Sequence, residues 1–100
     1  MYFITCFQKY EIDEFGWPDL GAGRTFGYYF RKGDAVEAVI NNNADIHEYT
    51  YRYAVIEHIP EGLYNVALDR LFFEWNEDAQ RYDMIDGEPF EDCFGNYAFG

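Results

Sequence analysis

The most constraining stretch of this sequence is residues 71–92, which read LFFEWNEDAQRYDMIDGEPFED. The opening LFFEW places Leu, Phe and Trp on one face and Phe and Glu on the other, the period-two pattern of a strand. A polar turn follows at 76–78, and a second strand-like run covers 81–85. Two such runs joined by a short polar turn predict a β-hairpin, so the chain must build part of its core on an antiparallel sheet.

Acidic residues concentrate in the same stretch. Between Glu74 and Asp92 there are eight acids and one cation, Arg81, which gives a local charge of −7. Same-face positions on a strand repeat about every 6.5–7 Å, close to the spacing of phosphates along a nucleic-acid strand. We therefore expect either a row of carboxylates that imitates nucleic acid or a solvated edge that resists aggregation through its charge. The acids are Glu74, Glu77, Asp78, Asp83, Asp86, Glu88, Glu91 and Asp92.

A chain of 100 residues suits one domain and is too short for two cores. Aromatic residues make up 22% of it, unlike acidic disordered segments, and predict a folded domain over residues 1–100. The formal net charge of −12 repels nucleic acid and anionic membranes and attracts basic protein surfaces. Residues 93–100 are expected to form a loosely packed aromatic tail that folds back on the domain or contacts a partner.

The first residues lack the basic region of a signal peptide, and no apolar run approaches the length of a transmembrane helix. Cys6 and Cys93 follow neither CxxC nor metal-finger spacing. These features predict a cytoplasmic protein with reduced thiols, and a disulfide between the two cysteines stays open at this point.

Further strands are expected at residues 2–8, 25–30 and 53–59, which are rich in β-branched and aromatic side chains. Gly27 interrupts the second of these runs and predicts either a bulge or a point of close approach to another segment. Together with the hairpin, they predict an α+β fold. It would be a single domain whose antiparallel-rich sheet of four to five strands carries one main helix on a face.

The main helix is expected to begin at Asp34, whose carboxylate can form a capping box with Glu37. The asparagine run at 41–43 should end it, because Asn tolerates the left-handed conformation common after a helix. Residues 45–51 combine a second D-x-x-E spacing with alternating tyrosines. We expect a short second helix there, with a strand as the alternative.

Four short motifs stand out as a set: YFITCF near the start, RTFGY at 24–28, YAVIE at 53–57 and FFEWN at 72–76. Together they resemble a family of small uncharacterised proteins from gut-bacterial genomes and their prophage-like mobile elements, over residues 1–86. The resemblance brings no assigned activity and no functional residue. Its mobile-element setting implies a role as an inhibitor of host defence or of competing elements.

The leading hypothesis is a small cytoplasmic inhibitor of the anti-defence or immunity type. It would occupy a basic, nucleic-acid-handling surface of a partner protein such as a nuclease, without itself binding nucleic acid or membrane. Negative charge would steer association, and buried aromatic side chains would hold the complex. The predicted contact residues are Glu74, Trp75, Glu77, Asp78, Tyr82, Asp83, Asp86, Glu88 and Phe90.

The alternative hypothesis is a nucleotide-binding sponge built on a basic island that contains no acid between Asp19 and Asp34. The glycines at 21–23 could expose backbone N–H groups to a phosphate, although the full P-loop spacing is absent. Such a module is expected to form homo-oligomers through spare apolar surface. The competing interpretation is that the cations pair with neighbouring acids. The residues of the predicted anion site are Arg24, Thr25, Arg31 and Lys32.

No residue pattern names a reaction. The two histidines, His47 and His58, follow no metal-binding or catalytic spacing. Cys6 lies in an apolar run, where burial is expected to raise its pKa and suppress its reactivity as a nucleophile. We therefore expect a protein that is not an enzyme, with no catalytic residue, no metal site and no cofactor.

Overall fold

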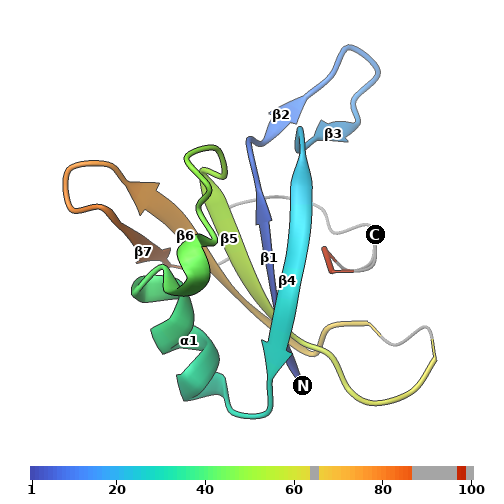
Figure 1. The fold of residues 1–100 in the computed structure, drawn as a ribbon. Helices are drawn as coiled ribbons and strands as arrows, with labels where there is room; N and C mark the ends of the chain where they lie inside the picture. The colour runs from blue at the N-terminus through green and yellow to red at the C-terminus, as the bar shows by residue number, and fades with distance from the viewer. Residues whose placement is uncertain (64–65, 87–96, 99–100) are drawn as a thin grey trace.

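The computed structural model describes residues 1–63, 66–86 and 97–98, and the following account concerns these residues. Five strands form an antiparallel sheet in the order β4-β1-β5-β6-β7, and one helix, α1, lies across one face (Figure 1). A separate small sheet of β2 and β3 extends the connection from β1 to β4. This single domain is the α+β fold that the sequence predicts. The elements are β1 (Tyr2–Phe7), β2 (Glu11–Ile12), β3 (Pro18–Asp19), β4 (Gly23–Tyr29), α1 (Lys32–Ile40), η1 (Asn43–Asp45), β5 (Tyr53–His58), β6 (Asp69–Asn76) and β7 (Arg81–Ile85).

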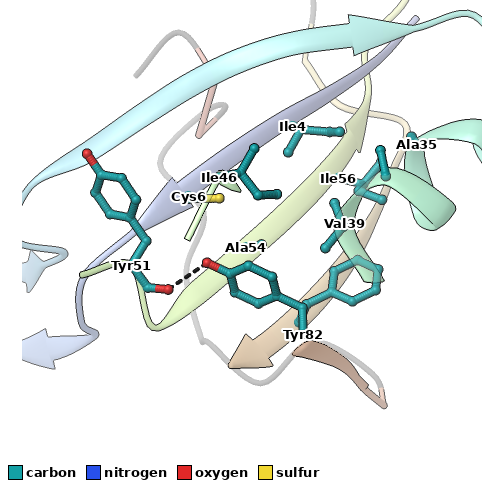
Figure 2. Close-up of a cluster of buried hydrophobic side chains, with 11 residues drawn as sticks. Ile4, Cys6, Ala35, Val39, Ile46, Tyr51, Ala54, Ile56 and Tyr82 are labelled. Carbon is teal, nitrogen blue, oxygen red and sulfur yellow. Dashed lines mark hydrogen bonds between the residues drawn. The ribbon is translucent and has the colours of Figure 1, made fainter. Parts of the chain in front are cut away.

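The larger core lies between α1 and the sheet (Figure 2). Ala35, Ala38 and Val39 are the buried residues of the helix. They belong to one cluster with buried strand residues such as Ile4 and Ile56. Small helical side chains allow the helix backbone to approach the sheet closely, so the larger strand side chains fill the space between the two layers.

The opposite face of the sheet, here called the far face, carries a second and smaller core of Phe7, Val55 and Phe72. Tyr97 packs against this cluster, which shows that part of the expected tail folds back on the domain. β5 is the middle strand, and four consecutive residues of it are buried. A strand covered on both faces has a continuous buried run in place of an alternating one.

The predicted strands are confirmed, with boundaries within two residues of those expected. The predicted bulge is also confirmed, because Ile4 pairs with Gly27 whereas Thr5 pairs with Thr25, so Phe26 is the extra residue. No helix of the described residues has the length and apolarity needed to cross a membrane.

The expected start of α1 needs correction. The helix begins at Lys32 with Arg31 at its N-cap position, and no side chain caps it. Asp34 lies inside the first turn, where its negative charge interacts favourably with the positive end of the helix dipole. Its end is as predicted, since Asn42 follows with a left-handed φ of +50°.

The short second helix expected over residues 45–51 does not form. A short turn is present at Asn43–Asp45, where Ala44 has a left-handed φ of +56°, and turns continue to Thr50. The side chain of Asn42 accepts a hydrogen bond from the backbone N–H of His47 at 2.9 Å and donates to Asp45 at 3.2 Å. Such local side-chain bonds compete with the hydrogen bonds of a helix.

Candidate protein-binding site

The β6–β7 ribbon, made of Asp69–Asn76 and Arg81–Ile85, is the hairpin that the sequence predicts. Its register pairs Trp75 with Tyr82 and Glu74 with Asp83. Paired residues of an antiparallel ladder share a face, and neighbouring pairs alternate between faces. The two aromatic side chains therefore lie on the helix side of the sheet, whereas the two carboxylates lie on the far face.

Both carboxylates at the centre of the predicted acidic row are already paired within the chain. Glu74 Oε2 lies 2.7 Å from Arg52 Nη2, and Asp83 Oδ1 lies 2.8 Å from Arg81 Nε. Asp83 also accepts a hydrogen bond from Asn76 at 2.8 Å. The amide of Asn76 and then the guanidinium of Arg81 lower the pKa of this carboxyl. These contacts weaken the field that the ribbon offers to a partner, and the described part of the row, up to Asp86, does not form a continuous line of free carboxylates.

The aromatic residues of the ribbon require a further correction. Tyr82 is completely buried, and its hydroxyl donates a hydrogen bond to the Tyr51 carbonyl at 2.6 Å (Figure 2). It is a core residue and cannot contact a partner. Trp75 is half-buried, because it stacks on His47 with ring centroids 3.7 Å apart and donates to Glu77 at 2.8 Å.

Three further predicted acids lie at the ends of the ribbon. Glu77 and Asp78 are exposed in the turn after β6, and Asp86 is exposed just after β7. Five residues of strand separate the two ends, a span of roughly 17 Å. These acids therefore contribute separate negative charges at the two ends of the ribbon. Glu88 and Phe90, the remaining predicted contact residues, lie outside the described residues.

The predicted basic island does not come together either. Arg24 and Thr25 are neighbours in β4, so their side chains point to opposite faces of the sheet. Arg31 and Lys32 lie beyond the other end of the same strand, roughly 20 Å from Arg24 at about 3.3 Å per residue. The structure thus offers no single anion site made from these four residues.

Most Lys and Arg side chains instead form ion pairs with acids of the same chain. Six of the seven Lys and Arg residues of the chain form ion pairs with acids in the described residues. The described residues therefore contain no free basic region that would offset the excess of negative charge. The pairs are Lys9 with Glu11 and Asp19, Arg24–Glu48, Lys32–Asp69, Arg52–Glu74, Arg70–Glu57 and Arg81–Asp83.

A different element, the connection between β1 and β4, carries an exposed apolar surface. Residues 11–19, here called the finger, extend past the end of the five-stranded sheet (Figure 1). Ile12, Phe15 and Trp17 on this finger are 57%, 77% and 66% exposed. Large apolar side chains that gather on a projecting hairpin, rimmed by acids, are typical of a surface that contacts another protein.

One carboxylate organises the tip of the finger. Asp13 Oδ1 accepts hydrogen bonds from the backbone N–H groups of Phe15 and Trp17, each at 2.9 Å. The backbone N–H of Asp13 donates to the Trp17 carbonyl at 2.8 Å, and that of Gly16 donates to the Asp13 carbonyl at 3.0 Å. Gly16 has a φ of +83°, which glycine adopts without strain. The two aromatic side chains are therefore presented by an ordered turn.

The base of the finger is held by a bridging lysine. Lys9 Nζ lies 3.2 Å from carboxylate oxygens of both Glu11 and Asp19, and its backbone N–H donates to the Leu20 carbonyl at 3.1 Å. The pKa of Lys9 is raised, mainly by its hydrogen bond to Asp19. The pKa of Asp19 is lowered, first by the backbone N–H of Gly21 and then by Lys9. Two strands of the finger are thus linked by charge where they leave the sheet.

The sequence-based hypothesis missed the finger as a binding site, because none of its predicted contact residues lies in residues 11–19. A usable signal was present. Asp13 is followed three residues later by Gly16, a typical pattern for a turn closed by an aspartate side chain. Phe15 and Trp17 flank that glycine in an otherwise polar segment, so they have no strand pattern that would bury them.

The groups with reactive chemistry lie elsewhere and are buried or stacked. Burial raises the pKa of the Cys6 thiol to about 12, so the thiol stays protonated at neutral pH. Burial also lowers the pKa of His47, and His58 stacks on Tyr2 with centroids 4.4 Å apart. Among residues 1–63, 66–86 and 97–98, no group of three His, Cys, Asp or Glu side chains converges in a way that could hold a metal ion.

No protein-family model, curated protein or solved structure matches this chain. The function proposed below therefore rests on the residues and contacts of the chain itself.

Proposed function

We propose that this protein is a small acidic inhibitor that binds a basic, nucleic-acid-handling protein and that the finger is its principal contact element. The observation that supports this proposal best is the exposure of Phe15 and Trp17 on a turn that Asp13 holds in one conformation. The role is one of binding, and it requires no catalytic residue, metal or cofactor from this chain.

The energetic argument begins with the two aromatic side chains. Phe and Trp each bury about 150–250 Å² when they enter a pocket, and Trp is enriched among the residues that dominate binding energy. Because hydrogen bonds already order the backbone of the turn, less conformational entropy is lost on binding than for a flexible loop. The geometry thus suits insertion of the fingertip into an apolar cleft.

Charge defines the chemistry of the partner. Glu11, Asp13, Glu14 and Asp19 lie on the finger and Lys9 lies at its base, which leaves a local net charge of −3. This local charge is part of a whole-chain charge of −12, which favours approach to a cleft with a basic rim and increases the rate of association at low salt. Grooves that bind nucleic acid combine a basic rim with apolar or aromatic contacts. Inhibition of the anti-defence type would follow from occupying such a groove.

The test is calorimetric titration of the full chain against a panel of purified nucleases and other nucleic-acid-binding proteins with basic grooves, at several salt concentrations. For a partner, the Phe15→Ala and Trp17→Ala variants should each weaken binding by at least about 2 kcal/mol, the level of an interface hot spot. Phe30→Ala is the matched control, because Phe30 is 78% exposed at a different place in the fold.

Three outcomes would contradict the proposal. The first is an affinity for the partner that is indifferent to salt, since charge steering requires salt dependence. The second is an equal loss of affinity in Phe30→Ala and Phe15→Ala, which would assign binding to exposed apolar surface in general. The third is a panel in which no basic protein binds the chain.

A further inference from the structure

A buried carboxylate lies at the centre of the far face. Glu57 belongs to β5 and is 0% exposed, next to the apolar cluster of Phe7, Val55 and Phe72. Arg70 of the neighbouring strand β6 donates from Nε to Glu57 Oε2 at 2.9 Å. Burying such a pair in an apolar sheet is expensive, and well-packed apolar residues usually seal a core at lower free energy. The buried charge of Glu57 therefore needs a role other than filling the core.

The rest of this carboxylate's hydrogen bonds go to the backbone of two consecutive residues. Tyr97 N–H donates to Glu57 Oε2 at 3.0 Å, and Ala98 N–H donates to Oε1 at 2.8 Å. On the other side, Thr25 Oγ1 donates to the Ala98 carbonyl at 3.0 Å. Three backbone groups of one dipeptide are thus recognised by two side chains from different strands. Such contacts do not depend on the identity of the dipeptide's side chains.

Side-chain recognition is added at the first position of the dipeptide. The ring of Tyr97 stacks on Phe7 at a centroid distance of 5.4 Å and meets the edge of Phe72 at 5.8 Å. The Arg70 guanidinium lies 5.9 Å from the centre of the same ring. An aromatic side chain therefore fits a slot between two aromatic side chains and a cation, a favourable setting for its π-system.

Empty space continues along the far face beside the dipeptide, and together they form a groove. A hollow of about 440 Å³ continues beside Tyr97 and Ala98, lined by residues that include Leu20, Gly21 and Thr25. Tyr97 and Ala98 line this hollow and do not fill it, so it offers room for a longer segment than the dipeptide. Several strands supply the recognition groups, so the site is built into the sheet and does not depend on a single loop.

We propose that the far face is a peptide-binding site for a segment that turns at an aromatic residue followed by a small one, and that Tyr97–Ala98 occupies it as an internal ligand. A partner protein that carries such a segment binds by displacing this dipeptide. A second copy of the chain is a poorer occupant, because two copies that each carry −12 repel one another. This site is separate from the finger, and its test does not depend on the function proposed above.

The test uses the full chain with Tyr97→Ala, which empties the aromatic slot, and a fluorescein-labelled synthetic peptide with the sequence of residues 95–100. Fluorescence polarisation should show saturable binding below about 1 mM. A peptide with Ala at the tyrosine position should bind about tenfold more weakly. The native chain should also bind the labelled peptide about tenfold more weakly than the variant, because its own dipeptide competes.

A second variant, Ala98→Pro, removes the N–H that bonds to Glu57 Oε1 and retains the tyrosine. The absence of peptide binding to folded variants would overturn the proposal. Unfolding of both variants would assign the dipeptide a purely structural role and overturn it as well. A native chain that dimerises with concentration but does not bind the peptide would assign the groove to a second copy, which again contradicts the proposal.

Discussion

Two carboxylates in this protein perform the same chemical task in opposite surroundings. Asp13 in the finger accepts hydrogen bonds from the backbone N–H groups of Phe15 and Trp17, and its residue is exposed. Glu57 on the far face accepts from two backbone N–H groups as well, but it is 0% exposed and also bonds to Arg70. The first contact arranges an exposed turn, whereas the second joins a late segment of the chain to the sheet.

The comparison shows how burial sets the value of a hydrogen bond. In water a lost bond is largely replaced by solvent, so the net contribution of an exposed bond is about 0.5–1.5 kcal/mol. In a buried site the groups left behind have no replacement partner, and the penalty rises to several kcal/mol when one of them is charged. The exposed carboxylate should therefore control local order, and the buried one global stability.

The largest expected effect comes from Glu57→Gln. The substitution leaves Arg70, whose side chain is only 12% exposed, without its counter-charge, and it places a donor group where donors already point. We expect a loss of roughly 3–5 kcal/mol in the free energy of unfolding, measured with urea. Glu37→Gln on the exposed side of α1 is the control and should change stability by less than about 0.5 kcal/mol. A loss below about 1 kcal/mol for Glu57→Gln would break the comparison.

The next effect extends the comparison to an uncharged buried group, the thiol of Cys6. Its pKa rises from 9.0 to about 12 on folding, so the unfolded chain ionises first as the pH increases. Stability from this group is complete below pH 9 and decreases between pH 9 and 12 by up to about 1.4 kcal/mol per pH unit. Urea unfolding at pH 8 to 10.5 should show a shallower alkaline decrease for Cys6→Ala. Equal slopes for the two proteins would show that the thiol does not contribute.

Asp13→Ala should have a smaller and more local effect. Loss of the two bonds at the fingertip should lower the free energy of unfolding by about 0.5–1.5 kcal/mol. Hydrogen exchange at the amides of Phe15 and Trp17, followed by NMR, should become several-fold faster, while the amides of β5 keep their protection. Glu14→Ala changes an adjacent exposed acid and should leave both amides unaffected. Global loss of protection in Asp13→Ala would mean that the finger and the sheet unfold as one unit.

The smallest effect concerns the paired acids of the β6–β7 ribbon. Arg52 and Glu74 form a close ion pair, but their side chains are 63% and 40% exposed. A double-mutant cycle with alanine at both positions should give a coupling of about 0.2–1 kcal/mol that decreases with added salt. A coupling above about 2 kcal/mol would show that this exposed pair behaves like the buried one.

The fold was largely predictable because hydrophobic pattern and turn chemistry agree along most of the chain. The alternation before the turn at 76–78 and the β-rich runs near the beginning specify antiparallel strands whatever the partners are. The bulge beside Gly27 was likewise visible, since glycine in a strand weakens regular pairing. The helix predicted over residues 45–51 was wrong for a local reason, because the side chain of Asn42 forms hydrogen bonds that compete with those of a helix.

The candidate site was much less predictable. Acid density along the ribbon did not reveal that Glu74 would meet Arg52, because that contact depends on the β5–β6 register. Tyr82 is of a residue type that often anchors interfaces, and only its place in the core cluster beside α1 decides that it is buried. The contact between Glu57 and residues 97–98 joins positions about 40 residues apart, a distance at which a single sequence carries no pairing signal.

The loop after α1 has a consequence for protein engineering. Asn42, Ala44, Asp45, Glu48 and Tyr49 all have positive φ, although none is a glycine. For most side chains this conformation costs about 1–2 kcal/mol relative to glycine. Ala44, which is exposed and has a φ of +56°, is therefore a position where glycine should raise the melting temperature instead of lowering it. A library screened for heat resistance should accumulate glycine in this loop, against its usual destabilising tendency.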